Sequence, residues 1–165
     1  MTPTDKFLNY FRALLGYQKC EEPADDGVTY YYTNLRGERN GRYTEYHNNG
    51  TLMAVAKFCQ NEPESFVEFD PETGRLLRMV EFDTKDRSKD NPKIVVEFDQ
   101  KGRATITFNT EDFPELAAEQ KIWARRSPTT RTAMLTAQAR TLVFENTIAD
   151  SQARKRRKAR EKGSL

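Results

Sequence analysis

The amino-acid sequence predicts an α+β fold, in which an antiparallel β-meander of about six or seven strands is flanked by an N-terminal helix and one or two C-terminal helices. Two observations lead to this prediction. Between residues 28 and 109, apolar and polar residues alternate, and turn signals separate the runs. On either side of that region, apolar residues recur at the spacing of a helix. Because tight turns join chain neighbours, we expect the strands to pair consecutively.

The chain divides into four segments by composition and period. We expect an N-terminal helix with an acidic linker, an antiparallel meander, C-terminal helices packing on the sheet, and a basic tail, over 1–27, 28–110, 111–149 and 150–165. In the first helix, Phe7, Phe11 and Leu14 share one side. This helix can pack on the protein's own sheet or dock on a membrane surface or partner. We favour the sheet, because the helix is short and has few cations.

The meander contains seven predicted strands. They are Val28–Thr33, Arg42–His47, Thr51–Phe58, Ser65–Asp70, Arg75–Asp83, Lys93–Asp99 and Arg103–Asn109. Predicted turns between them include Asn48-Asn49-Gly50, Asp70-Pro71-Glu72-Thr73-Gly74 and Asp99-Gln100-Lys101-Gly102. A degenerate tripeptide recurs as Glu45-Tyr46-His47, Glu68-Phe69-Asp70, Glu81-Phe82-Asp83 and Glu97-Phe98-Asp99. One hairpin cannot bury its apolar face alone, so repeated hairpins are expected to stack side by side.

Within the segment 37–52, glycines and an aromatic residue stand at regular hairpin positions. They are Gly37, Asn40-Gly41, Glu45-Tyr46 and Asn49-Gly50, and later copies keep Phe69 with Gly74 and Phe98 with Gly102. With these residues, the chain resembles the MORN-type β-hairpin repeat of bacterial antitoxin-like proteins over about half its length. The resemblance implies antiparallel hairpins and a scaffolding or binding role, not catalysis.

Alternation along the strands assigns the two faces of the sheet. The predicted core face takes Tyr46, Leu52, Ala54, Ala56, Phe58, Val67, Phe69, Leu76, Val80, Phe82, Ile94, Val96, Phe98, Ala104, Ile106 and Phe108. The predicted opposite face takes Tyr43, Glu45, His47, Glu68, Asp70, Met79, Glu81, Val95, Glu97, Asp99, Arg103, Thr105 and Thr107. The opposite face should therefore be acidic, with scattered apolar residues.

This acidic face has three interpretations. It can be an ordinary solvated surface, a docking surface for a basic protein or a mimic of a nucleic-acid backbone, or a carboxylate site for acid–base chemistry or metal binding. Because the glutamates recur in each repeat, they suggest a repeated surface instead of one assembled site. The candidate protein-binding residues are Tyr43, Glu45, Glu68, Glu81 and Glu97.

Helical periodicity returns after residue 111. Asp112 is a candidate N-cap for a helix over 113–126, in which Trp123 either anchors the helix to the sheet or stacks on a base. Ser127-Pro128 should end that helix. A second helix is predicted from Thr129 or Thr130 to about residue 162, with an apolar stripe of Met134, Leu135, Leu142, Phe144 and Ile148 in its first half.

The last part of the chain is strongly basic. Residues 119–165 hold 12 Lys and Arg against 4 Asp and Glu, whereas residues 1–118 hold 15 against 21. The candidate nucleic-acid-binding residues are Arg154, Lys155, Arg156, Arg157, Lys158, Arg160 and Lys162. Such a run suits contact with the phosphate backbone of RNA or DNA, largely independent of base sequence. Other interpretations are a solubilising tail, an import-like signal or a protein-docking arm.

The sequence lacks the residue combinations that several common catalytic, metal-binding and phosphate-binding sites require. His47 is the single histidine, and only Cys20 and Cys59 are cysteines, so no zinc cluster or Ser-His-Asp triad is indicated. Phosphate-binding loops of the GxxxxGK[ST] or GxGxxG type are missing too. We predict no catalytic residue, metal site or cofactor, and no membrane segment. Without a secretory signal, two thiols favour free cysteines and a cytoplasmic location.

These observations predict a non-enzymatic binding protein, whose acidic sheet engages a protein and whose basic arm contacts RNA or DNA. The alternative is a protein inhibitor or antitoxin-like module that acts through the sheet face. A third possibility is a carboxylate-based hydrolase that uses the same glutamates.

Overall fold

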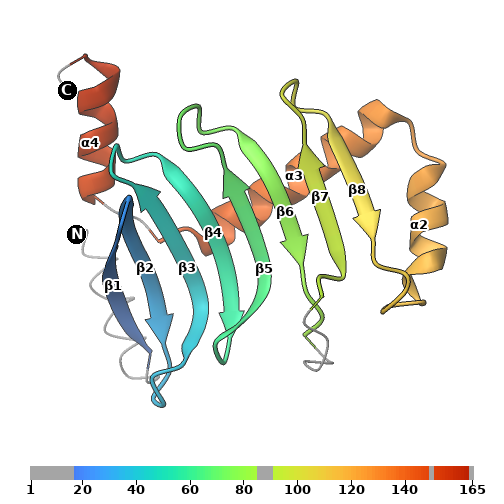
Figure 1. The fold of residues 1–165 in the computed structure, drawn as a ribbon, viewed down its shortest axis with the longest axis horizontal. Coiled ribbons are helices and arrows are strands. Elements are labelled where there is room, and N and C mark those ends of the chain that lie inside the picture. The colour runs from blue at the N-terminus through green and yellow to red at the C-terminus, as the bar shows by residue number, and fades with distance from the viewer. Residues whose placement is uncertain (1–16, 85–90, 149–150, 164–165) are drawn as a thin grey trace.

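In the described part of the chain, eight antiparallel strands form one sheet and are arranged in the order of the sequence (Figure 1). The computed structural model describes residues 17–84, 91–148 and 151–163, so the predicted N-terminal helix lies outside it. The strands are β1 Gln18–Ala24, β2 Gly27–Thr33, β3 Arg39–His47, β4 Leu52–Cys59, β5 Glu62–Phe69, β6 Leu76–Glu81, β7 Ile94–Phe98 and β8 Ala104–Phe108. The α+β class, the meander and all seven predicted strands are confirmed, with one strand more than expected.

The additional strand, β1, occupies part of the segment that was expected to be an acidic linker. It pairs with β2 along its whole length, and Asp25 and Asp26 form the turn. The sequence does not indicate this strand by an apolar pattern, because β1 lies at the edge of the sheet, where Pro23 and charged residues are tolerated. At the start of β2, a Cβ on Gly27 would lie 1.9 Å from the Tyr46 carbonyl oxygen, so only glycine allows this approach to β3.

Two of the predicted turns are closed by an aspartate that accepts backbone hydrogen bonds. The Asp70 carboxylate accepts from the N–H of Thr73 at 2.8 Å, and Gly74 completes the turn with φ of 69°. The Asp99 carboxylate accepts from the N–H of Arg103 at 2.9 Å. These backbone hydrogen bonds stabilise the charged form and hold the pKa of both carboxyl groups below the ordinary value.

Three helices are described, and they are α2 Leu116–Ala124, α3 Pro128–Asn146 and α4 Ser151–Glu161. Figure 1 shows α3 crossing one face of the sheet obliquely, with α2 beside β8 and α4 near the other end. Ser127 caps α3, because its hydroxyl accepts from the N–H of Thr130 at 3.2 Å, and Pro128 is the first helical residue. The predicted break at Ser127-Pro128 is confirmed. Within the described residues, no helix combines the length and apolar character needed to cross a bilayer.

Two helix predictions were wrong in detail. The Asp112 side chain does not cap α2, which begins at Leu116; it accepts hydrogen bonds from the side chains of Asn91 at 2.8 Å and Asn109 at 2.9 Å. The long helix predicted up to about residue 162 is two helices, because α3 ends at Asn146 and α4 begins at Ser151. The cause of this break is a set of contacts to the sheet, described below.

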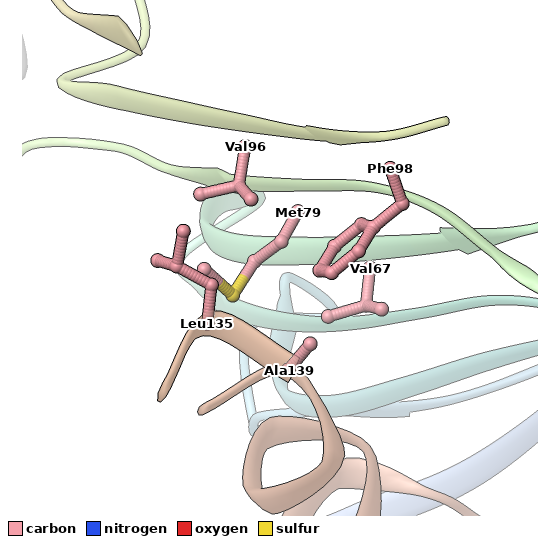
Figure 2. Close-up of a cluster of buried hydrophobic side chains, with 6 residues drawn as sticks. All are labelled: Val67, Met79, Val96, Phe98, Leu135 and Ala139. Carbon is pink, nitrogen blue, oxygen red and sulfur yellow. The ribbon is translucent and has the colours of Figure 1, made fainter. Parts of the chain in front are cut away.

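The main core lies between α3 and the middle of the sheet. Val67, Met79 and Val96 stand opposite one another on β5, β6 and β7, and all three are at most 1% exposed. Leu135 and Ala139 of α3 pack against them, as Figure 2 shows. Both are fully buried. The predicted apolar stripe is confirmed in part: Leu135 and Leu142 pack on this core, whereas Met134 is 39% exposed and Ile148 lies beyond the helix. Phe144 was expected in that stripe but is 87% exposed.

The face assignment was wrong for several strand residues. Met79 and Glu81 lie on the face that α3 covers, not on the opposite one. Ala54, Ala56, Phe58 and Val80 were expected in that core but lie on the other face, as their pairing with Glu68, Phe66, Tyr43 and Val95 shows. In β4, residues of both faces are apolar, so alternation cannot distinguish them, and the residue that faces α3 is Val55. We call the face opposite α3 the open face.

Candidate functional site

The first candidate surface is α4, which carries most of the predicted nucleic-acid-binding residues. Arg154, Lys155, Arg156, Arg157 and Lys158 are all exposed. Arg160 belongs to the same helix, although its side chain is outside the described part, and Lys162 follows the helix and is exposed. The sequence prediction of an exposed cationic segment is therefore confirmed for the side chains that the structure describes.

Within the part of the chain that the structure describes, these cations have little internal compensation. The ion pair recorded on α4 joins Arg157 Nε to Glu161 Oε1 at 3.1 Å, with side chains that are 67% and 61% exposed. Exposed i,i+4 pairs contribute roughly 0.3–0.5 kcal/mol and are screened by salt. Like charges also stand one turn apart, for example Arg154 with Lys158, which weakens the helix. A polyanion bound along α4 would relieve this repulsion.

The segment that follows α3 is fixed to the sheet by hydrogen bonds from β3. The Thr44 hydroxyl accepts from the N–H of Ile148 at 2.7 Å and donates to the carbonyl oxygen of Asn146 at 3.3 Å. The Tyr46 hydroxyl donates to the Ile148 carbonyl oxygen at 3.0 Å. Thr147 has extended backbone angles, which ends α3. Because Ile148 is buried against Tyr30, the chain is fixed to the sheet just before the cations begin.

The second candidate surface is the open face, where four of the five predicted protein-binding residues lie. Glu45, Glu68 and Glu97 fall on one line across the strands, as the pairing through Ala54 and Arg78 shows. Arg78 stands between two of these acids, and its Nε lies 3.1 Å from Glu68 Oε2. The acidic line is therefore interrupted by one cation.

Tyr43 belongs to a neighbouring apolar line on the open face that the sequence analysis missed. Tyr31, Tyr43, Ala56, Phe66, Val80 and Val95 pair in succession from β2 to β7. The sequence contained an indication of this line, because the central strands have apolar residues on both faces. We assigned Ala56 and Val80 to the core face instead. The Tyr43 hydroxyl donates to Glu45 Oε2 at 3.3 Å, and burial followed by the charge of Glu45 raises the pKa of Tyr43. Acidic and apolar lines thus run side by side.

Glu81, the fifth predicted protein-binding residue, is separated from the others. It lies on the helix-covered face, where its Oε1 accepts a hydrogen bond from the Gln138 side chain of α3. Burial raises the pKa of Glu81, and the nearby charge of Glu119 raises it further. Since Glu68 and Glu97 are on the open face, these three acids do not converge on one carboxylate site. No cluster of potential metal ligands occurs among the described residues.

The remaining predictions concern single residues. His47 ends β3, and its Nδ1 accepts from the N–H of Asn49 at 3.4 Å, which is a turn contact. Trp123 packs against apolar residues of the sheet, so its anchoring role is confirmed. Cys20 and Cys59 form no disulfide with each other.

Comparison with known proteins does not assign the chain to a family. No protein-family model matches the chain, and no curated protein matches it either. Among solved structures, the crystal structure of the GtfA/B complex bound to UDP and GlcNAc is similar at 7% identity and a TM-score of 0.27. The aligned region covers 62% of this chain and 26% of that one. A likeness this slight informs neither fold nor function.

Proposed function

We propose that this protein is a non-enzymatic binding protein whose helix α4 contacts the phosphate backbone of RNA or DNA. The observation that carries the proposal is the run of exposed cations from Arg154 to Lys158, on a helix whose described side chains form one ion pair, Arg157 with Glu161. Residues 1–118 hold more acids than bases, and this net negative charge disfavours phosphate contact there. Binding should therefore be directed to α4. A cytoplasmic location fits such a role.

Backbone contact predicts a steep dependence of affinity on salt. Each phosphate neutralised by Lys or Arg releases condensed counterions, and log K falls with log salt with a slope of about −0.9 per contact on duplex DNA. The experiment is fluorescence anisotropy with a labelled duplex at several salt concentrations. We expect Arg156→Gln/Arg157→Gln/Lys158→Gln to weaken binding and to reduce the slope by about 2 to 3.

A matched variant controls for total charge. Arg36→Gln/Lys101→Gln/Lys121→Gln removes the same charge from exposed positions outside α4 and should leave the slope nearly unchanged. Equal losses for the two variants would show that net charge, not α4, is responsible. Binding that is indifferent to salt would contradict the proposal altogether.

The open face supports a second role, which is the capture of a protein partner, as in an inhibitor or antitoxin-like module. The acidic line of Glu45, Glu68 and Glu97 beside the apolar line of Tyr43 and Phe66 is the specific observation in its favour. Such a surface suits a partner with both basic and apolar side chains. The resemblance of the segment 37–52 to antitoxin-like hairpin repeats agrees with this proposal.

Charge reversal on the open face tests the second role. The variant Glu45→Lys/Glu97→Lys should lose proteins captured from native lysate, whereas Glu81→Gln, on the other face, should retain them. Nuclease treatment of the lysate separates the two proposals, because nucleic-acid-bridged capture disappears and direct capture remains. Capture that survives charge reversal would exclude the acidic line as the contact.

A further inference from the structure

A groove of about 810 Å³ opens between the second half of α3 and the turns that join β5 to β6 and β7 to β8. Its floor is apolar and aromatic, formed by Phe69, Leu76 and Phe98. Val143 and Phe144 of α3 form a wall. A volume of this size and a mostly apolar lining are typical of small-molecule sites, which lie between roughly 300 and 1,000 Å³.

The charged residues around this groove are all of one sign. Arg75 lines it from the turn before β6, Arg140 from α3 and Arg154 from α4, and no carboxylate of the described residues does. Within the described part of the chain, neither Arg140 nor Arg154 has a recorded ion pair. Three guanidinium groups beside an apolar floor form a site that is complementary to an anion with an apolar body.

Two features of the lining favour a ligand that has both an anionic group and an apolar part. Arg75 Nη1 donates to the Gln100 carbonyl oxygen at 2.7 Å, but Arg75 Nε is buried with no acceptor among the described residues. Buried donors in proteins are nearly always paired, so the described residues leave this guanidinium only partly satisfied, without a carboxylate in the groove lining to neutralise its charge. Phe144 is 87% exposed at the rim, where a ligand would cover it.

We propose that this groove binds an amphipathic organic anion, with one carboxylate or phosphate group held by the arginines and an aliphatic body over Phe69 and Phe98. The proposal concerns a site separate from the nucleic-acid contact, because the groove faces α3 and the sheet, and only Arg154 belongs to both surfaces. Charge fixes the orientation of the ligand, and apolar burial supplies most of its affinity.

The test is isothermal titration of the full-length protein with octanoate, octyl phosphate and 1-octanol. The two anions should bind, and the neutral alcohol should bind at least tenfold more weakly, because it offers no charge to the arginines. Affinity should rise about fourfold for each methylene from hexanoate to octanoate. A stronger response to octyl phosphate than to octanoate, or the reverse, identifies which head group the site prefers.

Variants locate the binding site. Arg140→Gln should weaken octanoate binding about tenfold and leave 1-octanol unchanged, whereas Phe144→Ser should weaken both. Arg157→Gln is the matched control on α4 outside the groove and should have no effect. Both target residues are exposed, so the fold should survive, which circular dichroism confirms.

Three results would overturn this proposal. The first is equal affinity for octanoate and 1-octanol, and the second is an equal loss in Arg140→Gln and Arg157→Gln, which would indicate non-specific attraction to the basic surface. The third is binding of adenosine monophosphate with no binding of either octyl anion, which would make the groove a nucleotide site instead. Because the duplex-binding measurement depends on Arg156, Arg157 and Lys158, and none of these lines the groove, failure here leaves the proposal for α4 standing.

Discussion

Glu81 and Asp99 show how local surroundings move the pKa of one kind of group in opposite directions. At Asp99, backbone N–H groups and the Arg103 side chain stabilise the carboxylate, so its pKa falls. At Glu81, burial under α3 disfavours the charge, and its pKa rises above the ordinary 4.5 despite the hydrogen bond from Gln138. In the sequence, both residues are acids of the recurring tripeptide, and the tripeptide pattern does not indicate which of its carboxyl groups will be buried.

The raised pKa of Glu81 predicts a specific pH dependence of stability. The folded state binds the proton more tightly than the unfolded state, so this group makes the free energy of unfolding fall as pH rises from 4.5 through the folded pKa. Glu81→Gln keeps an acceptor for Gln138 and removes the charge. Urea unfolding should show the variant gaining stability relative to the wild type at pH 7 but not at pH 4.

The residue that best controls for this effect is Glu97, an exposed acid of β7. Glu97→Gln removes the same charge from the open face, and its difference from the wild type should not follow the pattern of Glu81→Gln. An equal gain in both variants would indicate a general charge effect, and burial of Glu81 would then not be the cause.

At the scale of elements, the end of α3 is decided by contacts and not by a breaker residue. The segment from Phe144 to Asp150 contains no glycine or proline, so local sequence favours one continuous helix. Hydrogen bonds from Thr44 and Tyr46 instead fix Ile148 in an extended stretch. Tertiary contacts of this kind override propensity and cannot be read from the sequence around the break.

Removing these hydrogen bonds should destabilise the protein. Thr44 is fully buried, so Thr44→Val leaves the N–H of Ile148 without its acceptor, at a cost of about 1–3 kcal/mol in the free energy of unfolding. Hydrogen exchange at the Ile148 amide should also accelerate. The matched control is Thr141→Val, at an exposed position of α3, which should change stability by less than about 0.5 kcal/mol.

Strand prediction succeeded where turns were explicit and failed where a strand had no apolar pattern. The Asn-Gly turn and the two Asp turns located the boundaries between β3 and β4, β5 and β6, and β7 and β8, because these residues form turns by local hydrogen bonds. β1 was missed because its charged residues need no burial at an edge. The face of β4 was assigned wrongly because both of its sides are apolar, and only the register with β5 resolves them.

At the scale of the whole molecule, the largest cluster of buried apolar residues in the described part of the chain lies between α3 and the sheet. Leu135 is fully buried within that cluster, so Leu135→Ala should lower the free energy of unfolding by about 2–5 kcal/mol. Met134, its neighbour, is 39% exposed, and Met134→Ala should cost much less. Denaturant unfolding followed by the fluorescence of Trp123 measures both. Similar losses would mean that the core in Figure 2 is not the main source of stability.

The candidate sites differ in how far the sequence could reveal them. The cations of α4 are contiguous, so composition alone identifies them. The groove gathers Arg75, Arg140 and Arg154 from three elements, and no spacing in the sequence links these residues. The apolar line on the open face likewise depends on strand register. Sites assembled from distant elements therefore require the fold before they can be seen.

The length of α3 also limits how many strands of the sheet this helix can cover. At 1.5 Å per residue, its 19 residues extend about 28 Å, which matches about six strands at a spacing of about 4.8 Å. The sheet has eight, and the aromatic side chains of β2 are covered by Ile148, beyond the helix. If another hairpin were inserted into this meander, α3 would not reach the apolar face of the added strands. A version of this chain with more strands would therefore need a longer α3 as well.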